Sequence, residues 1–212
     1  ILNLILIVAY QLTMMVKRLT LNKANANPHF IGSWFIENSL CNKLIDYFET
    51  NKYKQKLGQS ASGLNQKVKD RIDIQINAKD IDTEGNEIFI KYFERLFECY
   101  KDYNAQWPFL QTMIRNLDIG PCNLGRYNEG QHYQGLHCER GSIDNLSRLF
   151  AFMTYLNNVE QGGSTYFKHY DLEINPQQGL TLIWPAEWTH AHKGNIIKKG
   201  SKYIITGWMH IT

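Results

Sequence analysis

The pattern of apolar and polar positions changes character near the middle of the chain. In the first half, apolar residues recur at helical spacing in a segment that begins near Asn38 and Ser39 and in a second one over 86–103. The segment between them is polar over 52–69, which indicates a loop. It is followed by strict alternation of polar and apolar residues over 71–76, which is typical of a half-buried strand.

The second half of the chain consists of short apolar or alternating segments separated by glycine, asparagine and proline. The segment 149–156 is apolar at nearly every position, as expected for a strand that is covered on both faces. Many short strands with turn residues between them favour a sandwich or a barrel. We expect the helices to pack on one of its outer faces. The predicted strands are 122–127, 133–139, 149–156, 164–167, 180–184, 189–193 and 202–210.

Length and composition fit one globular domain. A chain of 212 residues with 43% hydrophobic and 20% charged residues can bury a substantial core, and it differs from disordered or collagen-like chains. The net charge of +3 is too small to predict nucleic-acid binding. The four cysteines form no C-x-x-C pair, which favours reduced thiols and a cytoplasmic location.

The first 16 residues are mostly apolar and are followed at once by Lys17 and Arg18. This run is shorter than the ~20 residues that a membrane-spanning helix needs, and no charged segment precedes it as in a secretory signal. It could be the end of an anchor helix or translation upstream of a start at Met14 or Met15, and we favour the second. We therefore treat 1–21 as an N-terminal extension and expect 1–16 to have no role in the fold.

Two His-containing motifs are candidates for metal binding. His137 and Glu139 stand two residues apart in one predicted strand, so both side chains would project from the same face. His190 and His192 have the same spacing in another. Either motif alone is weak, because such histidines more often form surface pairs or local hydrogen bonds. Two histidines and one carboxylate together would leave three coordination positions open, as non-haem iron(II) oxygenases require.

Lys202 lies inside the last predicted strand. A buried cation without an anionic partner is costly, so a lysine within a core strand predicts an anionic ligand. The alternative is a lysine at an exposed strand end, with its methylene groups on the surface.

From residue 127 to its C-terminus the chain resembles the prolyl 4-hydroxylase-type branch of the 2-oxoglutarate/iron(II)-dependent oxygenases. In that family the distal histidine precedes the 2-oxoglutarate lysine by ten residues, with a glycine two residues before the lysine. His192, Gly200 and Lys202 match this spacing, which selects His192 over His190. The matching segments are RYNEGQHY at 126–133, HCE at 137–139, Arg148 leading into YLNNVEQGGSTYF at 155–167, INPQQGLTLIW at 174–184 and HKGNIIKKGSKY at 192–203.

The resemblance implies a mainly β chain with N-terminal helices, of the α+β class. Its fold would be a double-stranded β-helix, or jelly roll, with the helices packed on one outer face. A single oxygenase domain would span 28–212, with helical support over 28–120 and the jelly-roll core over 121–212.

The resemblance also implies a dioxygenase that hydroxylates its substrate with Fe(II), 2-oxoglutarate and O2, with ascorbate as an optional further cofactor. The metal ligands would be His137, Glu139 and His192. Lys202 would bind the far carboxylate of 2-oxoglutarate, and Tyr127 and Tyr133 would line the co-substrate site.

Departures from the family pattern leave the substrate open. Most relatives have Asp where this chain has Glu139, and Ala151 stands where prolyl hydroxylases often have Thr. We expect a peptide or small-molecule substrate, with a peptidyl side chain such as proline favoured, and neither nucleic acid nor a membrane as partner. The oligomeric state is not predicted. Two alternative functions are a zinc hydrolase that uses His137, His190 and His192 and a non-catalytic jelly-roll binding protein.

Overall fold

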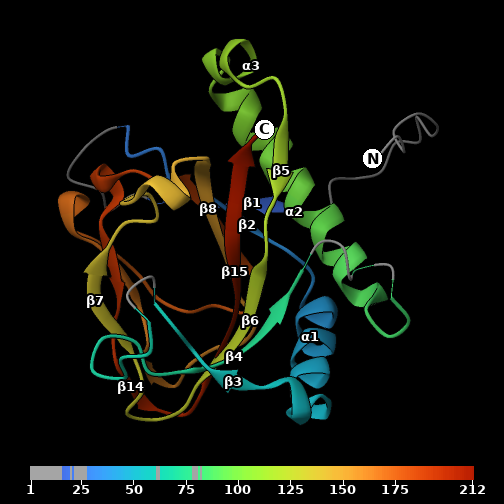
Figure 1. Ribbon diagram of the computed structural model, residues 1–212, viewed down its shortest axis with the longest axis vertical. Helices are drawn as coiled ribbons and strands as arrows, with labels where there is room; N and C mark the ends of the chain where they lie inside the picture. The colour runs from blue at the N-terminus through green and yellow to red at the C-terminus, as the bar shows by residue number, and fades with distance from the viewer. Residues whose placement is uncertain (1–15, 20, 22–27, 61–62, 78–80, 82) are drawn as a thin grey trace.

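The computed structural model describes residues 16–19, 21, 28–60, 63–77, 81 and 83–212 (Figure 1). Strands form most of its regular structure. The helices are α1 (Asn38–Thr50), α2 (Glu87–Gln106) and α3 (Phe109–Met113). The strands are β1 (Lys17–Arg18), β2 (Gly32–Phe35), β3 (Lys56–Leu57), β4 (Ile72–Ile76), β5 (Leu117–Ile119), β6 (Cys122–Tyr127), β7 (Tyr133–His137), β8 (Arg148–Tyr155), β9 (Gln161–Gly162), β10 (Thr165–Phe167), β11 (Leu172–Ile174), β12 (Leu180–Pro185), β13 (His192–Gly194), β14 (Ile197–Lys199) and β15 (Lys202–Ile211).

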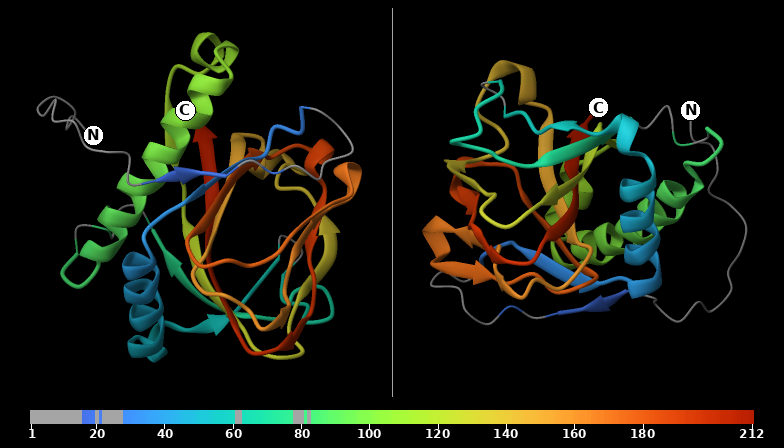
Figure 2. Two further views of the ribbon diagram at one scale, coloured as in Figure 1. Left: turned by 180° about the vertical axis from the view of Figure 1, so that it is seen from behind. Right: turned by 90° about the horizontal axis from the view of Figure 1, so that it is seen from below.

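Two antiparallel sheets enclose the interior of the molecule. The larger sheet has the strand order β1-β2-β12-β8-β15-β6-β4-β3, with β5 also paired to β15. The smaller one has the order β11-β10-β13-β7, and β14 and β9 form a separate pair. Figures 1 and 2 show the two sheets on opposite sides of the interior. The predicted jelly-roll architecture is therefore confirmed.

The two long helices cover the outer face of the larger sheet, as predicted (Figure 2). Helix α2 turns one apolar face inward because its buried residues recur every three or four positions. They pack with the buried face of α1 against the sheet. The buried residues of α2 are Phe89, Tyr92, Leu96, Cys99 and Tyr103.

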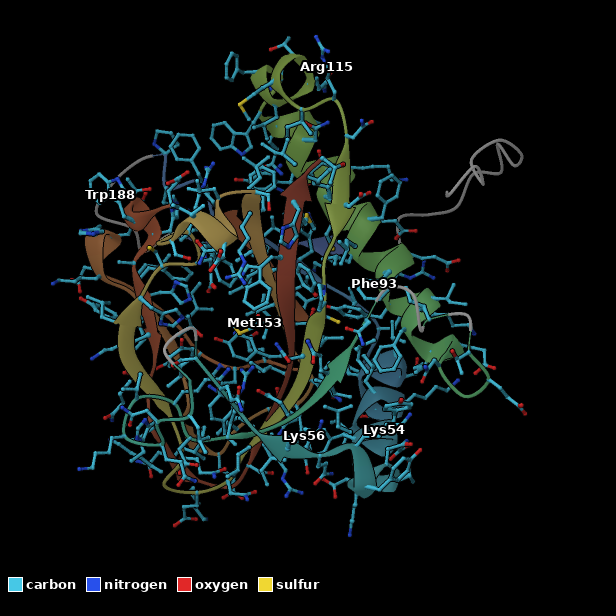
Figure 3. All side chains as sticks on the ribbon, viewed as in Figure 1. Lys54, Lys56, Phe93, Arg115, Met153 and Trp188 are labelled. Atoms are coloured by element: carbon cyan, nitrogen blue, oxygen red, sulfur yellow. The ribbon has the colours of Figure 1, made fainter. Side chains whose placement is uncertain are left out.

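Strand β8 is covered on both faces, which explains its nearly continuous apolar sequence. Phe150 and Phe152 pack toward the helices, whereas Ala151, Met153 and Tyr155 belong to a second apolar cluster between the sheets. In Figure 3, Met153 lies in the interior between the two sheets. This second cluster forms the apolar surroundings of the interior pocket.

The first half of the chain contributes more to the sheets than the sequence indicated. The polar segment 52–69 contains the short strand β3, and the unpredicted β2 pairs with β12. Helix α1 begins at Asn38 itself, with Glu37 as the residue before it. The division into a helical support and a jelly-roll core stays a prediction, although β2 and β4 join the larger sheet.

The end of the N-terminal extension takes part in the fold, contrary to our expectation for Val16. The Val16 side chain is buried, and Lys17 and Arg18 pair with Phe35 and Trp34 of β2. The remainder of the apolar run, 1–15, lies outside the described residues. Among the described residues, no helix is both long and apolar enough to cross a membrane.

Candidate active site

A pocket of about 540 Å³ lies between the two sheets. Its walls come from both sheets and from the loops that precede β4 and follow β7. The pocket contains every residue that the family resemblance assigned to the metal or co-substrate site. The lining includes Tyr127, Tyr133, His137, Glu139, His192 and Lys202.

Three of these side chains converge on one point. His137 ends β7, His192 begins β13, and the two residues are direct cross-strand partners. Glu139 follows β7, and its Oε1 lies 3.6 Å from Nε2 of His137 and 3.3 Å from Nε2 of His192. One ligand atom from each residue lies within 4.8 Å of the others, the only such group of ligand-type side chains in the described part of the chain. This donor set fits an iron(II) ion bound on one side.

Backbone contacts orient both imidazole rings for metal binding. Nδ1 of His137 donates to the carbonyl of Gly135 at 2.8 Å, and Nδ1 of His192 donates to the carbonyl of His190 at 2.9 Å. Because a carbonyl can only accept, the proton of each neutral ring lies on Nδ1. The lone pair of each Nε2 then faces Glu139, which is the tautomer that binds a metal.

The Glu139 carboxylate is also fixed in place. Trp208 donates its indole N–H to Oε2 at 2.7 Å, so that Oε1 faces the two histidines. Burial alone would raise the pKa of the Glu139 carboxyl group. Hydrogen bonds from His137 and His192 and their positive charge, which the rings carry only when Nε2 is also protonated, outweigh burial and hold this pKa well below the usual range. A carboxylate that faces two ring nitrogens requires a positive charge between them, either a proton or a metal ion.

His190 does not join this group, although it stands two residues from His192, the same spacing as between His137 and Glu139. It lies in a 3-10 turn, Trp188–His190, and the strand begins only at His192. The rule that residues two apart share a face therefore does not apply. Its Nε2 lies 3.0 Å from the carbonyl of His29, and burial lowers its pKa to about 4. A three-histidine zinc site is thus not formed.

Lys202 lies in the same pocket and is buried, with 2% of its surface exposed. Its Nζ donates to the carbonyl of Gly163 at 2.8 Å and lies 4.4 Å from the centre of the Tyr127 ring. No carboxylate of the described residues forms an ion pair with it. Burial and the nearby Arg71 lower the pKa of Lys202 to about 7, as for a cation that lacks its anionic partner.

The two predicted tyrosines occupy different parts of the pocket. Tyr127 lies opposite Lys202 in the pairing of β6 with β15, and its hydroxyl accepts a hydrogen bond from Arg71. Tyr133 instead stacks on the His137 ring, with centroids 4.0 Å apart and planes at 15°. Tyr127 is thus placed at the cationic end of the pocket and Tyr133 beside the metal ligands.

Sequence reasoning missed three residues of the site. Trp208 was not singled out as a site residue in the sequence, yet it contacts Glu139 directly. Arg148 stacks on Trp208 at 3.7 Å and donates to the backbone carbonyl of Glu139 at 3.0 Å. Arg71 lines the cationic end. The one available signal for Arg71 was its polar position in the alternating segment 71–76, which we had interpreted as half-buried.

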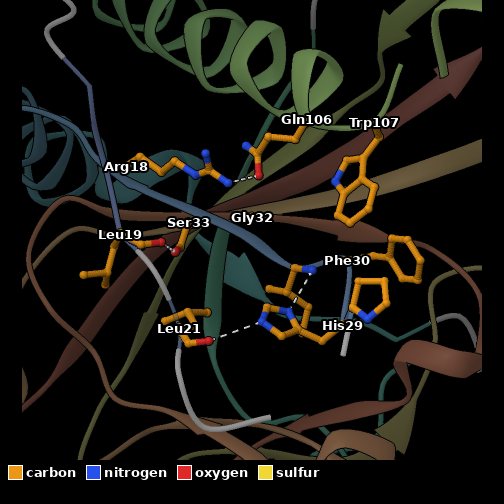
Figure 4. A pocket seen from close by; sticks show the side chains of 11 residues that line it. Arg18, Leu19, Leu21, His29, Phe30, Gly32, Ser33, Gln106 and Trp107 are labelled. Carbon is orange, nitrogen blue, oxygen red and sulfur yellow. Dashed lines mark hydrogen bonds between the residues drawn. The ribbon is translucent and has the colours of Figure 1, made fainter. Parts of the chain in front are cut away.

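A second, smaller pocket of about 160 Å³ lies beside the C-terminal end of α2 (Figure 4). Its lining includes Arg18, His29, Ser33, Gln106 and Trp107. Arg18 donates to Gln106, and no ligand-type cluster of the described residues lies there. Among the described residues, the side chains that could hold a metal ion therefore lie in the larger pocket.

Comparison with known sequences confirms the resemblance to the prolyl 4-hydroxylase-type oxygenases. Residues 122–210 match the model of the 2OG-Fe(II) oxygenase superfamily. The chain is 27% identical over 124 residues to the probable prolyl 4-hydroxylase 9 of Arabidopsis thaliana, a match that covers 46% of this chain and 43% of the relative. It is 27% identical over 71 residues to prolyl 4-hydroxylase subunit alpha-2 of Gallus gallus, a match that covers 30% of this chain and 13% of the relative. The chain thus spans less than half the length of these curated relatives.

Solved structures share the fold. The viral collagen prolyl hydroxylase of Paramecium Bursaria Chlorella virus-1, in its 2OG complex, superposes with a TM-score of 0.63 at 17% identity, covering 89% of this chain and 99% of that one. A Pseudomonas putida prolyl-4-hydroxylase superposes with a TM-score of 0.65 at 16% identity, covering 87% of this chain and 94% of that one. A prolyl hydroxylase of Trichoplax adhaerens, in complex with a peptide fragment of hypoxia inducible factor, superposes with a TM-score of 0.65 at 17% identity. This match covers 87% of this chain and 85% of that one.

The geometry predicts which histidine matters for metal binding. We expect His192→Ala to weaken Mn(II) binding by roughly 100-fold or more, because even partners that only orient a ligand are worth roughly 10- to 100-fold. His190→Ala, the same change two residues away, should leave the Kd within about twofold. Isothermal titration of the metal-free protein measures both. An equal loss in the two variants would contradict the assignment and favour the three-histidine site.

Proposed function

We propose that the protein is an iron(II)- and 2-oxoglutarate-dependent dioxygenase that hydroxylates a side chain of a peptide. The match of residues 122–210 to the 2OG-Fe(II) oxygenase superfamily supports this proposal. One observation carries the proposal. A single pocket contains both the converging triad of His137, Glu139 and His192 and the buried ammonium group of Lys202, which has no carboxylate partner among the described residues. A metal-chelating dicarboxylate would satisfy both ends at once.

Each residue of the triad has a positioning task. His137, Glu139 and His192 hold the metal from one side and leave its other positions facing the pocket. When bound, iron(II) supplies the activation of O2, coupled to decarboxylation of 2-oxoglutarate to succinate and CO2. The backbone bonds to the two Nδ1 atoms keep both rings fixed.

The remaining pocket residues bind the co-substrate and exclude water. Lys202 neutralises the far carboxylate of 2-oxoglutarate, and Tyr127 donates its hydroxyl proton to the same group. Apolar side chains such as Met153 and Trp184 line the wall, so that this pairing is made in a site of low dielectric constant.

The two alternative functions have less support. A zinc hydrolase would need His190 beside His137 and His192, and His190 is bonded elsewhere. A non-catalytic binding protein would have no use for a complete ligand set with Lys202 in the same pocket.

A peptide substrate is supported by the surface around the pocket. Leu136 lines the pocket with 47% of its surface exposed, and Ile143 and Leu146, beside the pocket residue Asn145, are 86% and 52% exposed. Trp188, 67% exposed, lies at the edge of the molecule in Figure 3, in a turn that an Arg140–Glu187 ion pair joins to this loop. Exposed apolar side chains on an ordered turn favour contact with another chain. The Trichoplax adhaerens neighbour bound to a peptide fragment supports the same substrate class.

Turnover of 2-oxoglutarate tests the proposed function. Protein reconstituted with Fe(II) should convert 2-oxoglutarate to succinate slowly in the presence of O2, even without its substrate. Glu139→Ala should abolish this reaction because it removes a metal ligand, and Lys202→Ala should abolish it at low 2-oxoglutarate concentrations. Succinate is quantified by mass spectrometry. An inactive wild-type protein that retains Fe(II), or equal turnover by the Glu139 variant, would refute the proposal.

The second prediction concerns pH. In the free protein the pKa of Lys202 is about 7, so the ammonium loses its proton above that pH and the far carboxylate loses its counter-charge. Between pH 7 and 8.5 the Kd of 2-oxoglutarate for the Mn(II)-loaded protein should rise by roughly ten- to thirtyfold. Lys202→Arg stays charged over this range, so its Kd should change by less than about threefold. A wild-type Kd that is independent of pH would contradict this assignment.

A further inference from the structure

Strand β4 has two different faces, and only one of them faces the helices. Ile74 and Ile76 are buried in the core under α1 and α2, and Ile72 packs against it. Arg71, just before the strand, lines the pocket, and Asp73 pairs with it; they are 4% and 8% exposed. Arg71 and Asp73, two of the polar positions of this alternating segment, therefore lie inside the protein, where ionised groups need partners.

The neighbouring backbone leaves room for this ion pair. Asp73 is the cross-strand partner of Gly125 on β6, and a Cβ atom on Gly125 would lie 2.5 Å from the Asp73 carboxylate. On the other side, a Cβ atom on Gly58 would lie 2.8 Å from both Arg71 and Asp73. Larger residues at either position would displace the pair, so the local sequence holds the Arg71 guanidinium in one place.

The guanidinium contacts Tyr127. Nε of Arg71 lies 2.7 Å from the Asp73 carboxylate, and NH1 donates to the Tyr127 hydroxyl at 3.0 Å. Burial raises the pKa of Tyr127, so the phenol keeps its proton. Because the hydroxyl oxygen already accepts from Arg71, its proton is left to be donated to another group.

Two cations therefore flank one tyrosine. Lys202 lies 4.4 Å from the centre of the Tyr127 ring, and the Arg71 guanidinium carbon lies 5.5 Å from it. Asp73 carries one negative charge, which it shares between Arg71 and Lys69, whose Nζ is 3.6 Å away. Among the described residues, this end of the pocket holds three basic side chains, Arg71, Lys69 and Lys202, but one carboxylate, Asp73. An anionic ligand would balance the excess of positive charge.

We propose that Arg71 is a positioning residue for the co-substrate: it fixes the Tyr127 hydroxyl so that Tyr127 and Lys202 together bind the far carboxylate of 2-oxoglutarate. This inference rests on the proposed function. It adds a residue that lies just before β4, outside the segment 122–210 that matches the superfamily. Arg71 does not touch the ligand in this account and acts through Tyr127.

The test compares two keto acids that share the metal-chelating end. 2-Oxobutyrate lacks the far carboxylate of 2-oxoglutarate, so only the binding of 2-oxoglutarate reports on the cationic end of the pocket. We expect Tyr127→Phe and Arg71→Lys each to raise the Kd of 2-oxoglutarate for the Mn(II)-loaded protein by roughly tenfold, the worth of a hydrogen bond to a charged group. The Kd of 2-oxobutyrate should stay within about twofold. In the Tyr127→Phe background, Arg71→Lys should have no further effect.

Arg126→Lys provides the matched control. Arg126 lies on β6 next to Tyr127 and pairs with Glu49 of α1, outside the pocket, so the same substitution there should change neither Kd. Tyr127→Phe removes only a hydroxyl and retains the Arg71–Asp73 pair, so it tests the inference even if Arg71→Lys does not fold.

Three results would overturn the inference. They are equal losses for both keto acids, an unchanged 2-oxoglutarate Kd in Tyr127→Phe, and an undiminished effect of Arg71→Lys in the Tyr127→Phe background. Failure of the proposed function looks different. In that case Lys202→Ala would also leave 2-oxoglutarate binding unchanged.

Discussion

The antiparallel pairing of β7 with β13 is the interaction on which the site depends. It places His192 directly opposite His137, so that two segments distant in the sequence present their imidazoles to the same point. A shift of the register by one residue would turn one ring to the other face of the sheet and separate the ligands. The backbone carbonyls of Gly135 and His190 then set the tautomers, so the same local backbone fixes both position and protonation.

The charges of the pocket are divided between its two ends. Glu139 supplies a negative charge where the histidine lone pairs converge, and Lys202 and Arg71 supply positive charges beside Tyr127. The cationic end is not balanced by the described residues alone, since Lys202 lacks a carboxylate partner among them. A ligand set that brings a metal ion to one end and a carboxylate to the other satisfies both. The apolar cluster between the sheets strengthens each interaction by excluding water.

Much of this arrangement could be predicted from the sequence, because the longer strands and helices carry clear periodicity. The sequence was less informative about where individual strands begin and which way individual side chains face. His190 and His192 could be separated only by the family spacing, since the pattern does not show that the strand begins at His192. Short strands such as β2 depend on pairing with distant partners rather than on their own sequence. The role of Arg71 was hidden for the same reason, because alternation cannot tell a solvent-facing side from one that faces an internal pocket.

An anaerobic absorption titration can show whether one pocket binds iron(II) and 2-oxoglutarate together. Chelation of iron(II) by a 2-keto acid gives a visible charge-transfer band, whereas succinate lacks the keto group and gives none. We expect 2-oxoglutarate to produce this band in the iron-loaded protein, saturably, and succinate to produce none. An iron-loaded protein that shows no band at saturating 2-oxoglutarate would rule out joint binding of the two in this pocket.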